Sequence, residues 1–280
     1  MAGAGWDGDL TWPGWAEAAL WALVASSSGL CGCLGGLFVP LGRRVLAAVM
    51  AFGAGALLGA VAFDVLPAAR DRGGPGPAVA GFLAGALIFT IIDFLLDRRG
   101  AVGRKHSGDP DEPAGRGPVP GAGTAAPRGT ASRGPRPGAA WAILAGAVLD
   151  GVPEAFALGV DLFAGHGLSW ALVAGIFLST LPEGLSGSVG LKRAGYRRAF
   201  IVLLWAAVAG VAAPAAAAGF LLAERLAGVT EAVILALAGG AVVAMAADTL
   251  TPEAYREGGN LVGLITALGM ILTFILAVEV

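Results

Sequence analysis

Long apolar segments, joined by short polar connections, make up most of this chain. Eight of them reach the roughly 20 residues that a helix needs to cross a bilayer. They cover about residues 14–39, 45–67, 78–96, 139–164, 168–190, 199–223, 232–250 and 261–280. The pattern predicts an all-α fold, a polytopic membrane helix bundle with eight transmembrane helices. We expect one transmembrane domain over residues 1–280, with spans 1–3 at about 14–96 and spans 4–8 at about 139–280.

The segment 97–138 differs from everything around it. It is rich in Gly, Pro, Ala and Arg and almost free of large apolar residues, so it cannot bury enough surface to fold by itself. We expect a disordered cytoplasmic loop between spans 3 and 4. An inert linker is the favoured interpretation. A regulatory or metal-collecting loop is the alternative, which His106, the single histidine of the segment, supports only weakly.

Composition agrees with a membrane protein. Hydrophobic residues make up 56% of the chain and charged residues 14%, against about 25% charged residues in soluble domains. The net charge of −2 offers no basic surface for nucleic acid. Cys31 and Cys33 would point to nearly opposite faces of a helix, which favours small core residues over a shared metal. Since no Lys or Arg precedes the first span, a cleavable signal peptide is not expected.

The basic residues predict how the chain is oriented. Fifteen of the 18 fall in the connections after spans 1, 3, 5 and 7. They are Arg43, Arg44, Arg98, Arg99, Arg104, Lys105, Arg116, Arg128, Arg133, Arg136, Lys192, Arg193, Arg197, Arg198 and Arg256; Arg70, Arg72 and Arg225 remain. Cytoplasmic loops carry the excess of Lys and Arg. We therefore expect a multi-pass protein of the plasma membrane with both termini outside.

Several acidic residues fall inside the predicted spans, where each costs roughly 2.5–3.5 kcal/mol on insertion scales. They are Asp64, Asp93, Asp150, Glu154, Glu183 and Asp248. No Lys, Arg or His is expected at comparable depth, so protons or metal ions must neutralise them. Solvated positions near helix ends are the alternative for Asp64 and Asp248, and an interfacial position is favoured for Asp93. His166 is expected in a solvated outer turn.

A Pro-Glu pair interrupts each of spans 4 and 5, at 153–154 and 182–183. A proline inside a helix removes one backbone bond and frees the carbonyl four residues earlier, here those of Leu149 and Leu178. Four residues before each glutamate, Asp150 and Ser179 lie on the same helix face. Two such helices would form an oxygen-lined pocket in apolar surroundings. A purely structural role, with protonated glutamates bonded to backbone, is the alternative.

With these features the chain resembles the ZIP (Zrt/Irt-like) metal transporters. The resemblance rests on the Pro-Glu kinks of consecutive spans, the Asp64-Val65-Leu66-Pro67 ending of span 2, the long loop after span 3, and eight spans with both ends outside. It implies a 3+2+3 arrangement in which central spans 4 and 5 carry the transport site. It also implies movement of divalent metal toward the cytoplasm.

The resemblance has departures at the site. The family's His-Asn-x-Pro-Glu-Gly becomes Asp150-Gly151-Val152-Pro153-Glu154-Ala155, and Ser179 and Thr180 stand where span 5 carries stronger ligands. Ala213 and Thr249 also replace positions where members carry acids. A second metal site is therefore largely lost. What survives is one metal site of Asp150, Glu154, Ser179 and Glu183, with Asp64 and Asp248 as candidates along the pathway.

An all-oxygen site has chemical consequences. Oxygen donors suit Mn²⁺, Mg²⁺ or Ca²⁺ at least as well as Zn²⁺, so broad selectivity is expected, although the resemblance ranks zinc or another first-row metal such as manganese or iron first. The metal is cargo, and no prosthetic group is expected. The partners are a divalent metal ion and the lipid bilayer, with a homodimer as an option. We expect alternating access, coupled to protons because an empty carboxylate cluster should hold them.

Three other functions compete with transport. A degenerate ZIP-like protein would bind or sense metal without moving it, which the missing histidines favour. An intramembrane aspartyl protease would need a Gly-x-Gly-Asp stretch that this sequence lacks, so no enzyme is expected. A carrier of organic cations would need aromatic faces beside the acids, and none is evident.

Overall fold

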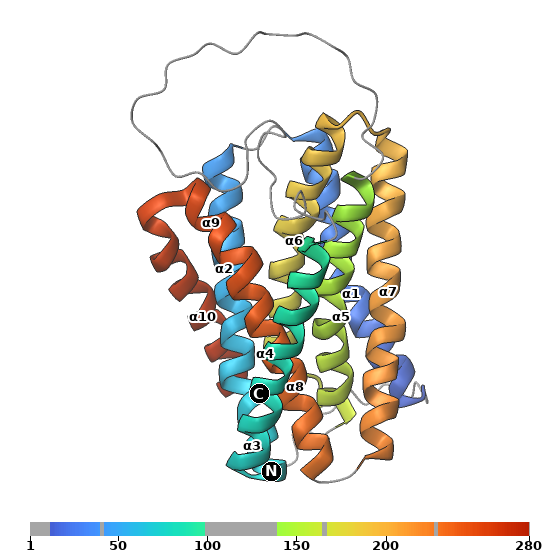
Figure 1. The fold of residues 1–280 in the computed structure, drawn as a ribbon, viewed down its shortest axis with the longest axis vertical. Coiled ribbons are helices and arrows are strands. Elements are labelled where there is room, and N and C mark those ends of the chain that lie inside the picture. The colour runs from blue at the N-terminus through green and yellow to red at the C-terminus, as the bar shows by residue number, and fades with distance from the viewer. Residues whose placement is uncertain (1–11, 40–41, 99–138, 164–166, 227–228, 280) are drawn as a thin grey trace.

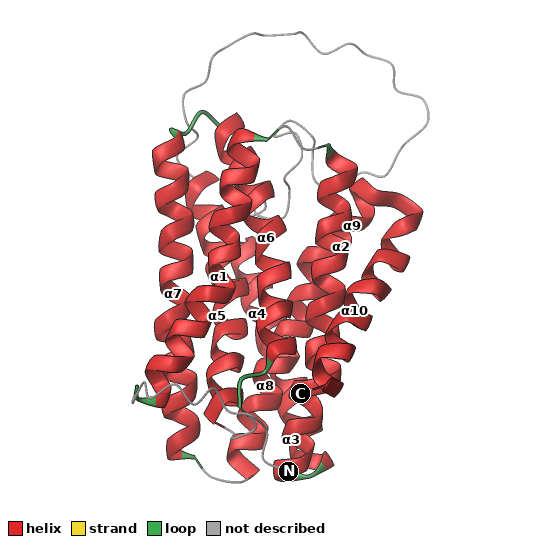
Figure 2. Cartoon of the chain, turned by 180° about the vertical axis from the view of Figure 1, so that it is seen from behind, coloured by secondary structure: helices red, strands yellow, loops and turns green. Residues whose placement is uncertain are grey.

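A computed structural model describes residues 12–39, 42–98, 139–163, 167–226 and 229–279. Within these ranges every regular element is a helix, and the long helices lie roughly side by side (Figures 1 and 2). The predicted all-α bundle is confirmed to that extent. Helix α4 runs through Arg98, so the first two residues of the predicted loop are helical. The rest of that loop, with His106, and also His166, lie outside the described residues.

The elements follow the apolar segments closely. They are α1 (Gly14–Phe38), α2 (Arg43–Ala60), the π-helix η1 (Val61–Val65), α3 (Leu66–Gly73), α4 (Pro75–Arg98), α5 (Ala139–Phe163), α6 (Trp170–Arg193), α7 (Arg198–Arg225), α8 (Val229–Met245), the π-helix η3 (Ala246–Leu250), α9 (Thr251–Gly258), the 3₁₀ turn η4 (Gly259–Leu261) and α10 (Val262–Glu279).

Seven helical ranges of the described chain are long and apolar enough to cross a membrane. The last of them, Val229–Val278, is 50 residues long and contains both predicted spans 7 and 8. Helical residues run through it without a gap, but Gly259 has φ 64°, and Figure 1 shows α10 returning beside α2. A membrane-spanning bundle is therefore supported, and the count of eight spans stays a prediction.

Two helical segments pass a proline by way of a π-helix. Pro67 and Pro252 lack the N–H that an α-helix needs and crowd the carbonyl four residues earlier. In both places the backbone widens into a π-helix just before the proline. The N–H of Leu66 bonds to the carbonyl of Val61, five residues back, and that of Thr251 bonds to the carbonyl of Ala246. The extra residue per turn carries the helix over the obstacle.

The two interrupted segments continue alike. Each short helix after the proline ends at a glycine in the left-handed region, Gly74 with φ 83° and Gly259 with φ 64°, where a residue without Cβ is favoured. A further helix then reverses the direction of the chain, α4 in the first segment and α10 in the second (Figure 1). The segments α2–α4 and α8–α10 are thus built by the same device and start from opposite ends of the bundle.

Packing divides the helices into two groups. In the α6 group, α1, α5, α6 and α7 pack on one another; in the α8 group, α8 packs against α3 and α4, and α2 packs against α9 and α10. The groups meet where α2 lies against α6 and α5 lies against α8. Glycines allow the closest approaches. A Cβ added at Gly159, Gly184, Gly85 or Gly269 would collide with the backbone of α7, α1, α8 or α2, respectively.

The bundle carries its basic residues at one end. The connections α1–α2, α6–α7 and α9–α10 and the end of α4 lie together at this end, here called the basic end (Figure 1). The described Lys and Arg residues there are Arg43, Arg44, Arg98, Lys192, Arg193, Arg197, Arg198 and Arg256. At the opposite end, here called the far end, the described ones are Arg70, Arg72 and Arg225. The predicted charge asymmetry is therefore an asymmetry of the folded bundle.

Candidate functional site

The two Pro-Glu pairs lie on neighbouring helices near the middle of the bundle. Glu154 is 1% exposed and Asp150 is 7% exposed, both on α5. With about 1.5 Å of rise per residue, Glu154 is roughly 22 Å from the start of α5. Asp150, one turn before it, is close enough to interact electrostatically with Glu154. Like charges at this spacing repel, so the pair is a place where a cation would be stabilised.

Ser179 joins the two helices of the site. Its hydroxyl is fully buried on α6 and donates to Oε1 of Glu154 on α5 at 3.1 Å. The same Oγ is 3.0 Å from the carbonyl oxygen of Ile176, the local bond that serine commonly makes inside a helix. Because one hydroxyl carries one proton, these two acceptors compete for it. The Glu154 carboxylate is thus held toward α6 by a bond that can switch away from it.

Glu183 completes the group that was predicted. It is half-buried on α6 and interacts electrostatically with Asp150, Glu154 and Glu253. The fold therefore brings Asp150, Glu154, Ser179 and Glu183 into one region between α5 and α6. Three carboxyl groups, those of Asp150, Glu154 and Glu183, therefore share this region and repel one another when charged.

Glu253, on α9, is a member of this region that sequence reasoning missed. It follows Pro252 directly, so the chain has a third Pro-Glu pair inside a helical segment. That repetition was the signal available in the sequence. Since α9 lies toward the basic end (Figure 1), Glu253 extends the acidic region from the middle of the bundle in that direction.

One carbonyl that Pro182 frees lies against a neighbouring helix. A Cβ added at Gly53 of α2 would collide with the carbonyl oxygen of Leu178. The glycine therefore leaves room for this oxygen in the interface between α2 and α6. The expectation that a freed carbonyl joins the metal ligands gains no support at this helix, because the group is engaged in packing.

The acidic side chains of the described residues do not form a complete metal site in this structure. Within the described ranges, no three His, Cys, Asp or Glu side chains lie together as a set that could hold a metal ion. Asp150, Glu154 and Glu183 interact electrostatically with one another, but their carboxyl groups do not form one set of metal ligands. Oxygen donors of this kind suit hard divalent cations.

Asp64 and Asp248, the residues predicted along a pathway, have different surroundings. Asp64 is in η1, half-buried, and accepts a hydrogen bond from Ser169 at the start of α6. Asp248 is exposed on η3. Asp93, for which an interfacial position was favoured, is only 6% exposed on α4. None of the three is among the acids that interact with Glu183.

A second charged group at the far end was also missed. Asp161 on α5 is 4% exposed and interacts electrostatically with Asp64 and Arg72. Arg72 on α3 pairs with Glu231 on α8 at 3.2 Å, with side chains 12% and 11% exposed. Asp161 is thus a further buried acid, outside the six expected from the sequence, and it has a basic residue as an electrostatic neighbour. Its position seven residues after Glu154, on the same helix face, was the signal for it.

A scan against models of protein families and a search of curated proteins found no match to this chain. The resemblance to the ZIP transporters thus rests on the residues quoted for it.

Proposed function

We propose that this chain is a membrane transporter that moves divalent metal ions toward the cytoplasm. The observation that carries the proposal is the group of Asp150, Glu154 and Glu183, with Ser179, in the middle of an apolar bundle. Carboxyl groups buried at such depth are costly and mark ion pathways. Zinc or another first-row metal, such as manganese or iron, ranks first as cargo, and the oxygen donors favour broad selectivity.

The fold supports a way for the ion to move. The α6 group carries the predicted ligands, and the α8 group adds Glu253 on the side of the basic end. Movement of one group against the other would expose the acids first to the far end and then to the basic end, which is alternating access. The repeated device in α2–α4 and α8–α10 supports a 3+2+3 arrangement of eight spans around α5 and α6.

Orientation is part of the same proposal. Basic residues concentrate in cytoplasmic connections, so the basic end faces the cytoplasm. The start of α1 and the end of α10 are then outside. The plasma membrane is the proposed location. Transport is then directed from the far end to the basic end, past the acids in the middle.

The test is metal uptake into proteoliposomes with a panel of divalent ions. We expect wild-type protein to accumulate at least one ion, and Glu154→Gln and Glu183→Gln to lose most of that uptake. Glu17→Gln, which changes an exposed glutamate in the first turn of α1, is the matched control and should transport normally. Uptake by both site variants at the wild-type rate would contradict the proposal.

A second function is favoured by one observation. Because no three acids of the described residues are assembled as a metal site, a protein that binds or senses metal without moving it is the alternative. Binding measured by calorimetry separates the two. Metal binding that Glu154→Gln abolishes, together with no uptake by wild type, would favour the sensor.

A further inference from the structure

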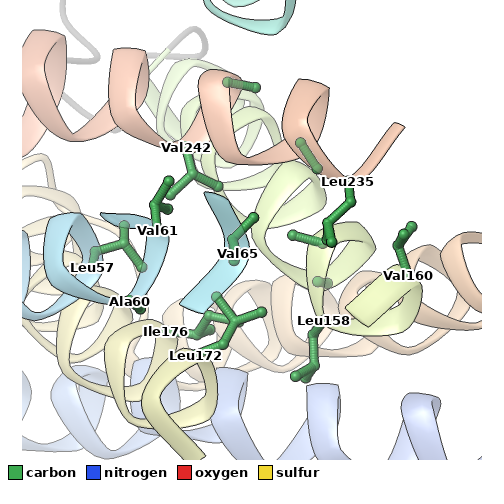
Figure 3. Close-up of a cluster of buried hydrophobic side chains, with 14 of the residues drawn as sticks. Leu57, Ala60, Val61, Val65, Leu158, Val160, Leu172, Ile176, Leu235 and Val242 are labelled. Carbon is green, nitrogen blue, oxygen red and sulfur yellow. The ribbon is translucent and has the colours of Figure 1, made fainter. Parts of the chain in front are cut away.

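A layer of apolar side chains separates the acidic site from the far end. Along α6 the residues Ser179, Ile176, Leu172 and Ser169 follow one another at intervals of three or four, so they lie along one helix face. Ile176 and Leu172 are 1% and 0% exposed. Figure 3 shows them in a cluster with Leu57, Ala60, Val61 and Val65 of α2 and η1, Leu158 and Val160 of α5, and Leu235 and Val242 of α8. In this structure the site is therefore sealed on the far side.

Beyond this layer lies the far-end network, which consists of Asp64, Arg72, Asp161, Ser169 and Glu231. These residues come from five different elements: η1, α3, α5, the residue that caps α6, and α8. Asp161 and Ser169 belong to the α6 group, and the other three to the α8 group. The network therefore crosses the boundary between the two groups.

Two direct contacts and one electrostatic interaction connect the residues of the network. Ser169 caps α6, its Oγ accepting from the N–H of Leu172 at 3.0 Å, while its hydroxyl donates to the Asp64 carboxylate. The Arg72–Glu231 pair is 3.2 Å long and largely shielded from solvent. Arg72 also interacts favourably with the buried Asp161. Arg72, paired with Glu231 in the α8 group, therefore offsets part of the repulsion between Asp64 and Asp161 of the α6 group.

We propose that the far-end network is a latch that holds the two helix groups together at this end. The latch breaks each time the far end opens, because opening must separate Asp161 and Ser169 from Arg72 and Asp64. Removing Arg72 leaves the buried Asp161 beside Asp64 without the cation that offsets their repulsion, which disfavours the closed arrangement that brings them together. Loss of the latch therefore shifts the population toward the state open at the far end. This inference rests on the proposed function, since it assigns the closed state of a transporter.

The experiment measures opening directly, without metal. Leu172→Cys is placed in the full-length chain with Cys31→Ala and Cys33→Ala, in nanodiscs, and its modification by a charged, membrane-impermeant maleimide is timed. With the latch intact, modification should be slow because Leu172 is buried on the far side of the layer. Arg72→Gln should accelerate it about tenfold or more.

Matched controls lie at the same end of the molecule. Arg225→Gln makes the same chemical change at an exposed position at the end of α7, and Arg72→Lys keeps the charge; both should modify more slowly than Arg72→Gln. Equal rates in latch and control variants, or fast modification of the parent, would overturn the latch. If Arg72→Gln does not yield a monodisperse protein, the milder Ser169→Ala against Ser169→Thr provides the same comparison.

Failure of the latch and failure of the proposed function give different results. If wild type takes up metal but the latch variants do not change the modification rate, only the latch proposal is contradicted. Accelerated modification in a chain whose wild type takes up no metal would leave the latch in place as the closure of the far end. Only the transport proposal would then fall.

Discussion

At the scale of single residues, Ser179 determines how the two central helices meet. Its hydroxyl, on α6, bonds directly to Glu154 on α5, a glutamate that is 1% exposed. A buried carboxyl group that loses such a partner costs about 1–3 kcal/mol. The residue therefore contributes both to the stability of the bundle and to the position of Glu154.

Ser179→Ala should lower the free energy of unfolding by about 1 kcal/mol and weaken metal binding about tenfold, as the loss of a group that orients a ligand does. Ser188→Ala is the matched control, because Ser188 is equally buried on α6 but donates only to the backbone carbonyl of Leu185. Binding is followed by competition with a metal indicator. An equal loss of metal affinity in both variants would show that Ser179 has no particular role.

Sequence patterns could predict only part of this site. The interval of four between Asp150 and Glu154 is a property of one helix, and it predicted their proximity correctly. Glu253 and Asp161 were missed because their roles depend on how separate helices pack, with Glu253 near Glu183 and Asp161 near Arg72. Arg72 falls after the end of the predicted span 2, and its partner Glu231 comes from a helix more than 150 residues away.

At the scale of elements, apolar length predicted the helices well but not how they pass a proline. Span 2 was expected to end at Pro67, yet helical backbone continues to Gly73. A π-helix depends on the hydrogen bonds of one turn, which hydropathy does not register. For the same reason, the continuous helical segment formed by α8, η3 and α9 is longer than the predicted span 7.

Close helix contacts at glycine give a prediction for α5 and α7. Gly159→Ala should lower the melting temperature in detergent, because its Cβ would collide with the carbonyl of Ala216 and overpacking costs about 1–3 kcal/mol. Gly210→Ala, on α7, is the control: nothing lies within 4 Å of its added Cβ, and alanine favours a helix by about 1 kcal/mol over glycine. The two substitutions should therefore shift the melting temperature in opposite directions. A rise for both would contradict this account of the interface.

At the scale of the whole molecule, the two ends of the bundle differ in charge and in structure. Eight described basic residues lie at the basic end and three at the far end, and the far end carries the shielded Arg72–Glu231 pair. Successive connections lie at alternating ends of the bundle, so assigning one end to the cytoplasm assigns a side to every connection. The positive-inside rule makes that choice.

The orientation can be measured with two single cysteines in the Cys31→Ala, Cys33→Ala background. Trp12→Cys precedes α1 at the far end, where Trp12 is 54% exposed, and Ala194→Cys is in the turn between α6 and α7 at the basic end. In intact cells an impermeant thiol reagent should label Trp12→Cys and leave Ala194→Cys unlabelled until the membrane is opened. Since Lys192, Arg193, Arg197 and Arg198 flank Ala194, replacing them with glutamine should weaken this preference. If Ala194→Cys alone were labelled in intact cells, the orientation would be the reverse of the one proposed. The proposed metal movement would then run from the acids toward the outside.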